Sequence, residues 1–330
     1  MGRRLTAFLI CTFIAACAWA QYKPGYAELN DSETVTSLKG HVSYIASPSM
    51  NGRAAGSEGE ALTAMYVTRV LSEYGVEMLS GAEGDLFGIK RESGDTLTSR
   101  NVIGVIQGRD PALRDNYIVI GARMDNIGTR DITIDGEKVT RIFPGANGNA
   151  SGLALMLELA RMVSINSLVL KRSVIFAAFG ASMESYAGSW YFLTRSFPAA
   201  GKIDAMVNLD SVGIPSDGLI AFTSSNADLN VCVQALAGTL QPIQPVLTTR
   251  EPIASDHRSF YAKEIPSVLF TTGNYRERGT ERDTPDILEY ETMERELEYI
   301  YDFTIRMANG PRPDFNPNEE ARRRLGTSGS

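Results

Sequence analysis

Apolar, β-rich segments alternate with amphipathic helical segments along most of this chain, and that alternation limits the folds it can adopt. Segments 101–106, 117–121 and 173–179 have the composition of buried strands. Segments 149–163 and 293–307 carry apolar residues at helical spacing. Because such strands are apolar on both faces, helices must cover both sides of the sheet they form. We therefore predict an α/β fold with three α/β/α layers and a doubly wound, mainly parallel sheet.

Other local signals extend the same pattern. Ser57 followed by Glu60 resembles a capping box, which predicts a helix beginning there. The polar segment 131–141 contains an Asp-Gly turn signal and predicts a β-hairpin. In an open α/β sheet, chemistry sits at the C-terminal ends of the strands, so the residues after each strand are the candidate site. The remaining expected elements are helices at 186–193 and 229–240 and strands at 205–210, 219–223 and 267–271.

The N-terminal segment has the pattern of an export signal. Arginines at positions 3 and 4 precede an apolar run, and Ala18-Trp19-Ala20 forms a small-x-small cleavage site. We therefore predict a signal peptide over 1–20 and a single domain over 21–310. Apolar residues become scarce after that, which predicts a disordered tail over 311–330.

A second interpretation of the leader concerns its cysteine. Ile14-Ala15-Ala16-Cys17 resembles a bacterial lipobox, and processing there would leave a lipid on Cys17. A retained anchor is a third interpretation, although the apolar run is short for a stable span. We expect an exported protein, periplasmic or at the cell surface, that contacts a membrane only through a lipid on Cys17.

Few side chains in this composition can bind metal through nitrogen or sulfur. The chain has two histidines, His41 and His257, and three cysteines, of which only Cys232 lies beyond the leader. These counts exclude a cysteine-rich zinc module, an internal disulfide in the processed chain and any site that needs three imidazoles. Loss of two leader arginines changes the formal net charge from −7 to −9. That charge has the wrong sign for nucleic-acid binding, so no nucleic-acid partner is expected.

The segments that follow the expected strands form an ordered series. Together with Met50–Ser57, which is similar to an opening GR-x-x-GS segment, the series resembles the family-28 metallopeptidases. That family includes the co-catalytic zinc aminopeptidases and the glutaminyl cyclases. The resemblance covers most of the chain after the leader and implies a zinc-exopeptidase-like fold. The segments are Gly121–Asn126, Pro144–Gly152, Phe179–Glu184, Asn208–Gly213, Ser255–His257 and Thr272–Thr284.

The resemblance implies two zinc ions held by histidines and carboxylates, with a glutamate as general base. Most of these positions carry other residue types here. The two histidine positions fall on Arg123 and Gly279, and the bridging aspartate falls on Gly148. The general base falls on Ser182 and the neighbouring glutamate ligand on Met183. Of the metal-ligand positions that the resemblance implies, Asp210 alone carries the residue type that binds metal in the family.

Together with the predicted leader, these substitutions indicate an exported pseudopeptidase with no cofactor and no confident catalytic residue. Arg123 puts a fixed positive charge where a dication would bind, and we expect Asp210 or Asp125 to pair with it. The retained cleft is expected to bind a peptide or protein partner in the cell envelope, with Arg123 as a carboxylate anchor. The expected cleft residues are Arg123, Met124, Asp125, Asn147, Gly148, Asn149, Ser182, Met183, Asp210, Asp256, His257 and Gly279.

Two alternatives remain open from the sequence. One is an active zinc aminopeptidase or other exopeptidase with a rearranged site around Asp125, Asp210, Glu184 and His257, in which case zinc is the cofactor. The other is a scaffold or accessory subunit of a cell-envelope complex that uses an outer face of the fold. A Ser182 nucleophile with His257 as its base is disfavoured, because nothing near Ser182 resembles a nucleophile elbow.

Overall fold

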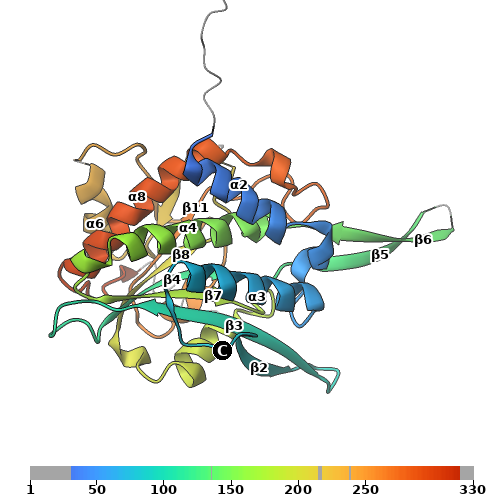
Figure 1. The fold of residues 1–330 in the computed structure, drawn as a ribbon, viewed down its shortest axis with the longest axis horizontal. Helices are drawn as coiled ribbons and strands as arrows, with labels where there is room; N and C mark the ends of the chain where they lie inside the picture. The colour runs from blue at the N-terminus through green and yellow to red at the C-terminus, as the bar shows by residue number, and fades with distance from the viewer. Residues whose placement is uncertain (1–30, 135, 215–217, 238, 320–330) are drawn as a thin grey trace, which may run out of the picture. The chain divides into compact units, whose positions relative to one another are not determined.

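The computed structural model describes residues 31–134, 136–214, 218–237 and 239–319 (Figure 1). The predicted signal peptide and the lipid site at Cys17 lie outside these residues. From Thr34 onward the described residues belong to one compact unit. Among the described residues, no helix has both the length and the apolar character needed to cross a bilayer.

Nine of the described strands form a single sheet in the order β1-β3-β7-β4-β8-β11-β9-β10, with β2 also paired to β3. A separate two-stranded sheet contains β5 and β6. The bounds of the strands are β1 Glu77–Met78, β2 Asp85–Lys90, β3 Thr96–Ile106, β4 Tyr117–Arg123, β5 Gly128–Ile134, β6 Glu137–Phe143, β7 Ser173–Phe179, β8 Ile203–Leu209, β9 Ile220–Phe222, β10 Val246–Thr248 and β11 Ser267–Thr271.

The centre of the sheet is parallel and its flanks contain antiparallel pairs. Strands β7, β4, β8 and β11 are adjacent and run in one direction. On one side β3 is antiparallel to β7, and on the other side β9 is antiparallel to β11. The expected strands 101–106 and 219–223 therefore exist but run against the parallel centre. An apolar run indicates burial and not strand direction, so the sequence pattern did not reveal this difference.

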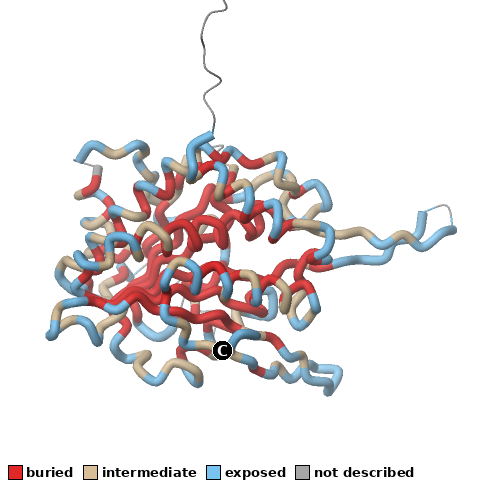
Figure 2. Tube along the Cα trace, in the orientation of Figure 1, coloured by how far each residue is buried: buried red, intermediate tan, exposed pale blue. Residues whose placement is uncertain are grey.

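Helices cover both faces of the sheet, in agreement with the three-layer prediction. Side chains alternate along a strand, so Ile118 and Ile120 of β4 pack in one apolar cluster while Val119 packs in another. Figure 1 shows α2, α3, α4 and α8 on one side, and Figure 2 shows the buried residues between them and the sheet. The helices are α2 Glu33–Ile45, α3 Glu58–Glu73, α4 Ser151–Ile165, α5 Ala187–Tyr191, α6 Ala227–Ala237, α7 His257–Tyr261 and α8 Tyr290–Asn309.

Three local predictions are confirmed in kind, and two of them are corrected in extent. Ser57 caps α3, because its side chain accepts a hydrogen bond from the backbone N–H of Glu60. The aromatic helix expected at 186–193 is shorter: α5 ends at Tyr191 and continues as a π-helical turn over Phe192–Ser196. The hairpin expected at 131–141 is formed by β5 and β6.

Residues 311–319, the first part of the stretch expected to be disordered, lie against α6 and α7. The backbone N–H of Asp314 donates to Asp228 Oδ2 at 2.9 Å, and the ring of Phe315 lies edge-on to Tyr261. Pro317 also forms an isolated β-bridge with Asn226. Residues 320–330 are outside the described part of the chain.

His41 belongs to a buried polar cluster that joins three helices away from the strand ends. Glu158 of α4 accepts hydrogen bonds from Ser37 of α2 at 2.6 Å and from Tyr74 after α3 at 3.1 Å. His41 Nε2 lies 3.3 Å from Glu158, and Arg161 Nε donates to the other carboxylate oxygen at 2.8 Å. Burial opposes the charge, but these partners hold the pKa of Glu158 at about 2. The cluster gives His41 a structural role in holding α2 on α3 and α4.

Glu296 of α8 is a buried acid without a comparable set of partners. It is fully buried, and neither carboxyl oxygen has a hydrogen-bond partner among the described residues. Burial therefore raises its pKa well above the ordinary value. Because the folded state keeps the proton, the contribution of Glu296 to stability is greatest below its ordinary pKa and is lost as the pH rises.

We expect Glu296→Gln to raise the free energy of unfolding at pH 8 by roughly 1–3 kcal/mol, because the variant carries no charge to be desolvated. At pH 5 the gain should be much smaller. Denaturant unfolding of both proteins at the two pH values measures this difference. Glu298→Gln, at an exposed position of the same helix, is the matched control and should change stability at neither pH. Equal stability of Glu296→Gln and wild type at pH 8 would contradict the prediction.

Candidate functional site

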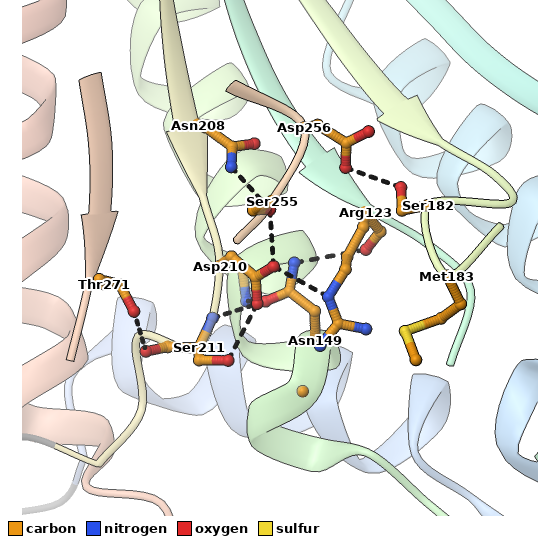
Figure 3. A network of polar contacts seen from close by, with 12 residues as sticks. Arg123, Asn149, Ser182, Met183, Asn208, Asp210, Ser211, Ser255, Asp256 and Thr271 are labelled. Carbon is orange, nitrogen blue, oxygen red and sulfur yellow. Dashed lines mark hydrogen bonds and ion pairs between the residues drawn. The ribbon is translucent and has the colours of Figure 1, made fainter. Parts of the chain in front are cut away.

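The parallel centre of the sheet brings several candidate side chains to one edge. Arg123 ends β4, Asp210 directly follows β8 and Ser182 lies just after β7. These strands are neighbours, so their C-terminal ends meet. Ser255 and Asp256 precede α7 and approach the same edge (Figure 3). We call this group of residues the strand-end site.

An ion pair between Arg123 and Asp210 lies at the centre of the strand-end site, as the sequence predicted. Arg123 Nε donates to Asp210 Oδ2 at 2.9 Å, and the two side chains are 7% and 1% exposed. Ser255 Oγ donates to Asp210 Oδ2 at 2.7 Å, and Ser211 Oγ donates to Oδ1 at 2.9 Å. Burial opposes ionisation of Asp210, but the charge of Arg123 and the Ser255 hydrogen bond hold its pKa below the ordinary value. Both partners are therefore charged at neutral pH.

The guanidinium of Arg123 also occupies the space beside Gly148. Arg123 Nη1 donates to the backbone carbonyl of Asp125 at 3.0 Å. A Cβ atom added to Gly148 would lie 2.9 Å from Arg123 Nη2 and 2.9 Å from the Tyr275 hydroxyl. No hydrogen bond from Nη2 is present within the described residues. Glycine at 148 and arginine at 123 are therefore matched, because a larger residue at 148 would press on the guanidinium.

Asp125 supports the loop after β7. Its two carboxylate oxygens accept hydrogen bonds from the backbone N–H groups of Ser182 at 2.7 Å and Met183 at 3.0 Å. Burial raises the pKa of Asp125, and these two hydrogen bonds oppose the increase. The carboxylate of Asp125 thus holds the backbone of the neighbouring loop, and of the two aspartates expected to pair with Arg123 it is Asp210 that does so.

Ser182, at the position of the general base, is bonded to a second buried acid. Its Oγ donates to Asp256 Oδ2 at 2.7 Å, and Ser189 Oγ donates to Asp256 Oδ1 at 2.6 Å. Burial raises the pKa of Asp256 to about 7, although both hydroxyl groups favour its charged form. A carboxylate beside a serine, without an imidazole in contact, is not an activating arrangement for a nucleophile.

Amides and a further carboxylate hold the loop before α4 in place. Asn149 Nδ2 donates to the carbonyl of Leu209 at 3.0 Å, and its Oδ1 accepts from the N–H of Ser211 at 3.0 Å. Asn147 Oδ1 accepts from the N–H of Gly213 at 2.7 Å. Asp283 accepts from the N–H groups of Asn147 and Gly148 at 2.8 and 3.2 Å. These residues act on backbone groups and fix the loops around the ion pair.

Other candidates lie elsewhere. His257 is fully buried and its Nε2 contacts Glu251 at 3.0 Å, while its Nδ1 has no partner within the described residues. Glu184 is exposed and lies 3.8 Å from Arg91. The side chain of Met183 is exposed beside the site, and Gly279 lies on the surface. Met124 is fully buried in the core of the fold.

Arg53 and Ser255 are site residues that the sequence analysis did not assign. Arg53 is fully buried, and within the described residues its guanidinium donates only to backbone carbonyl groups, including those of Met124 and Gly145 at 3.2 and 3.0 Å. Burial lowers its pKa to about 10, and the charge of Arg123 adds to the decrease. In the sequence, Arg53 belongs to the GR segment and Ser255 directly precedes Asp256. These positions suggested a place near the site but did not show what either side chain contacts.

The donor set of this site does not fit the zinc pair that the resemblance implies. The one retained carboxylate, Asp210, is bonded to a guanidinium, and the positions at Gly148 and Gly279 offer no side-chain donor. A zinc ion needs at least about three protein ligands, usually with imidazole or thiolate among them. In the part of the chain that the structure describes, no three His, Cys, Asp or Glu residues gather in a suitable group. The side chains of this site therefore support no metal-dependent step.

Comparison with known proteins relates most of this chain to peptidases. The model described as "Peptidase family M28" matches residues 101–304. Leupeptin-inactivating enzyme 1 of Streptomyces exfoliatus is 25% identical over 247 residues, which cover 73% of this chain and 50% of that protein. Aminopeptidase YwaD of Bacillus subtilis is 26% identical over 242 residues, which cover 64% of this chain and 46% of that protein. The chain thus spans about half the length of these curated relatives.

Solved structures with the same architecture include peptidases and a cyclase. A zinc aminopeptidase of Bacillus subtilis has a TM-score of 0.65 at 15% identity, covering 85% of this chain and 97% of that chain. A glutaminyl cyclase of Porphyromonas gingivalis has a TM-score of 0.64 at 18% identity, covering 82% and 97%. At these identities the likeness concerns the fold alone, and it confirms the expected zinc-exopeptidase-like architecture.

The buried acid Asp256 predicts a pH dependence of stability. Its pKa is raised, so the folded state keeps the proton and stability falls as the pH rises from about 4 to about 7. We expect Asp256→Asn to reduce that fall by about 3 kcal/mol, because the amide resembles the neutral acid and never ionises. Denaturant unfolding between pH 4 and pH 8 measures the two slopes.

The exposed Asp115→Asn is the matched control and should follow the wild-type slope. Burial also raises the pKa of Glu60 to about 7. Glu60 is present in both wild type and Asp256→Asn, so the difference between their slopes of stability against pH is due to Asp256. Identical slopes for wild type and Asp256→Asn would show that Asp256 ionises normally in the folded protein.

Proposed function

Because this chain belongs to peptidase family M28, we propose that it is a catalytically inactive member whose strand-end site binds a peptide or protein partner. One observation carries the proposal: the guanidinium of Arg123 is bonded to Asp210, the one position that keeps a metal-ligand residue type. The likeness to a zinc aminopeptidase shows the fold, and the strand-end site lies where the C-terminal ends of the parallel strands meet. Because a shared fold does not imply a shared function, the proposal rests on the side chains at the strand-end site, which differ from those of a zinc site.

The Arg123–Asp210 pair opposes metal binding in two ways. A dication at this position would meet a fixed positive charge at short range in a poorly hydrated site. It would also have to displace the guanidinium from Asp210 and leave that guanidinium buried without its partner, which is strongly unfavourable. Burial itself disfavours the charged form of Arg123, but Asp210 more than compensates and keeps its pKa above the ordinary value. The pair therefore stays intact across the physiological pH range.

The same side chain supports the binding role. Arg123 uses Nε for Asp210 and Nη1 for a backbone carbonyl, and Nη2 makes no hydrogen bond within the described residues. A guanidinium with an unused donor recognises a carboxylate, such as the C-terminus of a peptide. The exposed side chain of Met183 lies beside it and offers apolar contact (Figure 3). Export to the cell envelope, expected from residues 1–20, is part of this proposal.

A rearranged hydrolase has less support from the same contacts. Its candidate residues each have a different partner: Asp125 holds backbone N–H groups, Asp210 holds Arg123, Glu184 lies near Arg91 and His257 contacts Glu251. An active site would require several of these groups to leave their partners and converge. None of the contacts described at the strand-end site supports a scaffold role.

Restoring two family ligands tests the inactive assignment. We expect the purified wild type to bind no stoichiometric zinc and to cleave no member of an aminoacyl fluorogenic panel with zinc added. Because Arg123, Asp210 and Gly148 converge, the double variant Arg123→His, Gly148→Asp should bind zinc roughly 100-fold more tightly than wild type. Isothermal titration with zinc and metal analysis after gel filtration measure the change.

Two controls accompany this test. Circular dichroism checks that the double variant is folded, and adding Asp210→Asn to it should abolish the gained zinc binding. Stoichiometric zinc in the wild type, with turnover that disappears in Asp210→Asn, would overturn the inactive assignment.

The binding role is tested with peptides that differ only at the C-terminus. We expect wild-type protein to retain members of a peptide library with free carboxyl ends at least about tenfold more strongly than the same peptides amidated, because only the free acid pairs with Nη2. Arg123→Met combined with Asp210→Asn removes both charges together and should abolish the preference. Fluorescence polarisation against the retained peptides measures both effects.

Arg91→Met is the control, because it removes an exposed arginine outside the ion pair. It should keep the preference for free acids. A preference that survives loss of the Arg123–Asp210 pair would place peptide binding elsewhere, and absence of any preference would favour the scaffold role.

A further inference from the structure

The hairpin of β5 and β6 extends away from the main sheet and forms its own two-stranded sheet (Figure 1). We call residues 128–134 and 137–143 the arm. Its base lies at η1, Pro48–Arg53, where the carbonyls of Gly128 and Phe143 approach Gly52. Most of the arm is exposed (Figure 2). An isolated two-stranded hairpin is at best marginally stable in water, so an exposed arm of this kind favours further pairing.

The register of the arm separates its side chains into two faces. Ile132 lies opposite Val139, and Ile134 lies opposite Glu137. Directly opposite residues share a face, so Ile132, Ile134 and Val139 form one apolar group near the tip. Ile132 and Ile134 are 41% and 39% exposed. The apolar group is therefore presented to solvent and not to the core of the fold.

The outer edge of β6 has backbone groups available for another strand. A two-residue connection makes Ile134 and Glu137 a hydrogen-bonding pair. Pairs alternate along an antiparallel ladder, so the N–H and C=O groups of Lys138, Thr140 and Ile142 point outward. These outward groups match the spacing that a second antiparallel strand requires.

We propose that the arm pairs with the arm of a second copy of this chain, edge to edge through β6. The copies are antiparallel, related by a two-fold axis at Val139. This register places Lys138 opposite Thr140 of the partner subunit, so that outward backbone groups meet. It also places Glu137 opposite Arg141 of the partner subunit, and the reciprocal pair forms on the other side of the axis.

Charge supports this register. Glu137 has no ion-pair partner among the described residues, and Arg141 has only an exposed contact with Glu281 at 3.4 Å. Pairing about Val139 would therefore join two opposite charges twice.

Packing supports the same register. The joined arms form a four-stranded sheet in which Val139 lies beside Val139 of the partner subunit. Each valine already lies opposite Ile132 of its own arm. The result is an unbroken row of four β-branched residues on one face, which is a favourable cross-strand arrangement.

Other edge pairings lose these contacts. Moving the axis to Thr140 places Val139 opposite Arg141 and Glu137 opposite Phe143. Pairing through β5 about Asp131 would oppose two aspartates, which is unfavourable. Pairing through β5 about Ile132 would place Arg130 opposite Ile134 and Asp131 opposite Thr133, so no opposite charges would meet. The axis at Val139 is thus the favoured one. The paired segment is short, so we expect a weak dimer that depends on protein concentration.

Charge reversal tests the pairing without touching the strand-end site. Sedimentation velocity of the purified protein across a concentration series measures the monomer–dimer equilibrium. We expect Glu137→Arg and Arg141→Glu each to weaken the dimer at least tenfold, since each places like charges opposite one another twice. The combination of both substitutions restores opposite charges and should return the equilibrium to within about threefold of wild type.

Arg91→Glu, outside the arm, is the control and should leave the dimer unchanged. Circular dichroism of each variant checks the fold. A wild type that stays monomeric at every concentration would overturn the proposal. So would single variants that dimerise like wild type, or a double variant that does not recover.

Discussion

The buried pair of Arg123 and Asp210 sets the chemistry of the strand ends. Two unlike charges in a poorly hydrated site stabilise each other, and removing either one leaves the other uncompensated. Neither side chain can therefore change alone without a cost to folding. The pair also determines its surroundings: Ser255 and Ser211 supply hydroxyl donors to the carboxylate, and Gly148 leaves room for the guanidinium. The carboxylate of Asp210 thus has Arg123 as its charged partner.

The sequence predicted the fold well because the fold depends on features that a sequence displays. Apolar strands and amphipathic helices alternate with clear periods, and both the layers and the strand-end location follow from them. The pairing of Arg123 with a neighbouring aspartate also followed from charge alone. Strand direction at the flanks did not, because residues 102–106 of β3 and strand β9 are as apolar as the parallel strands, and only their pairing partners show their direction.

Side-chain direction was the other limit. Glu184 and His257 stand close in sequence to residues of the strand-end site, yet Glu184 is exposed and His257 turns to Glu251. Ala181, Ser185 and Tyr186 adopt positive φ angles, so the chain after β7 turns sharply and carries Glu184 outward. Such turns depend on local backbone conformations that an apolar period does not report. Candidate residues taken from spacing alone therefore needed the structure to separate them.

Arg53 joins parts of the chain that flank the arm. Its guanidinium holds the carbonyl of Met124 before β5 and the carbonyls of Pro144 and Gly145 after β6. The two ends of the arm are thus fixed by one side chain, independently of the strand pairing between them. A change in the length or the side chains of the arm leaves these hydrogen bonds in place, because they are made at its two ends. The arm can thus alter its pairing edge while Arg53 keeps the segments beside Arg123 and Gly148 in position.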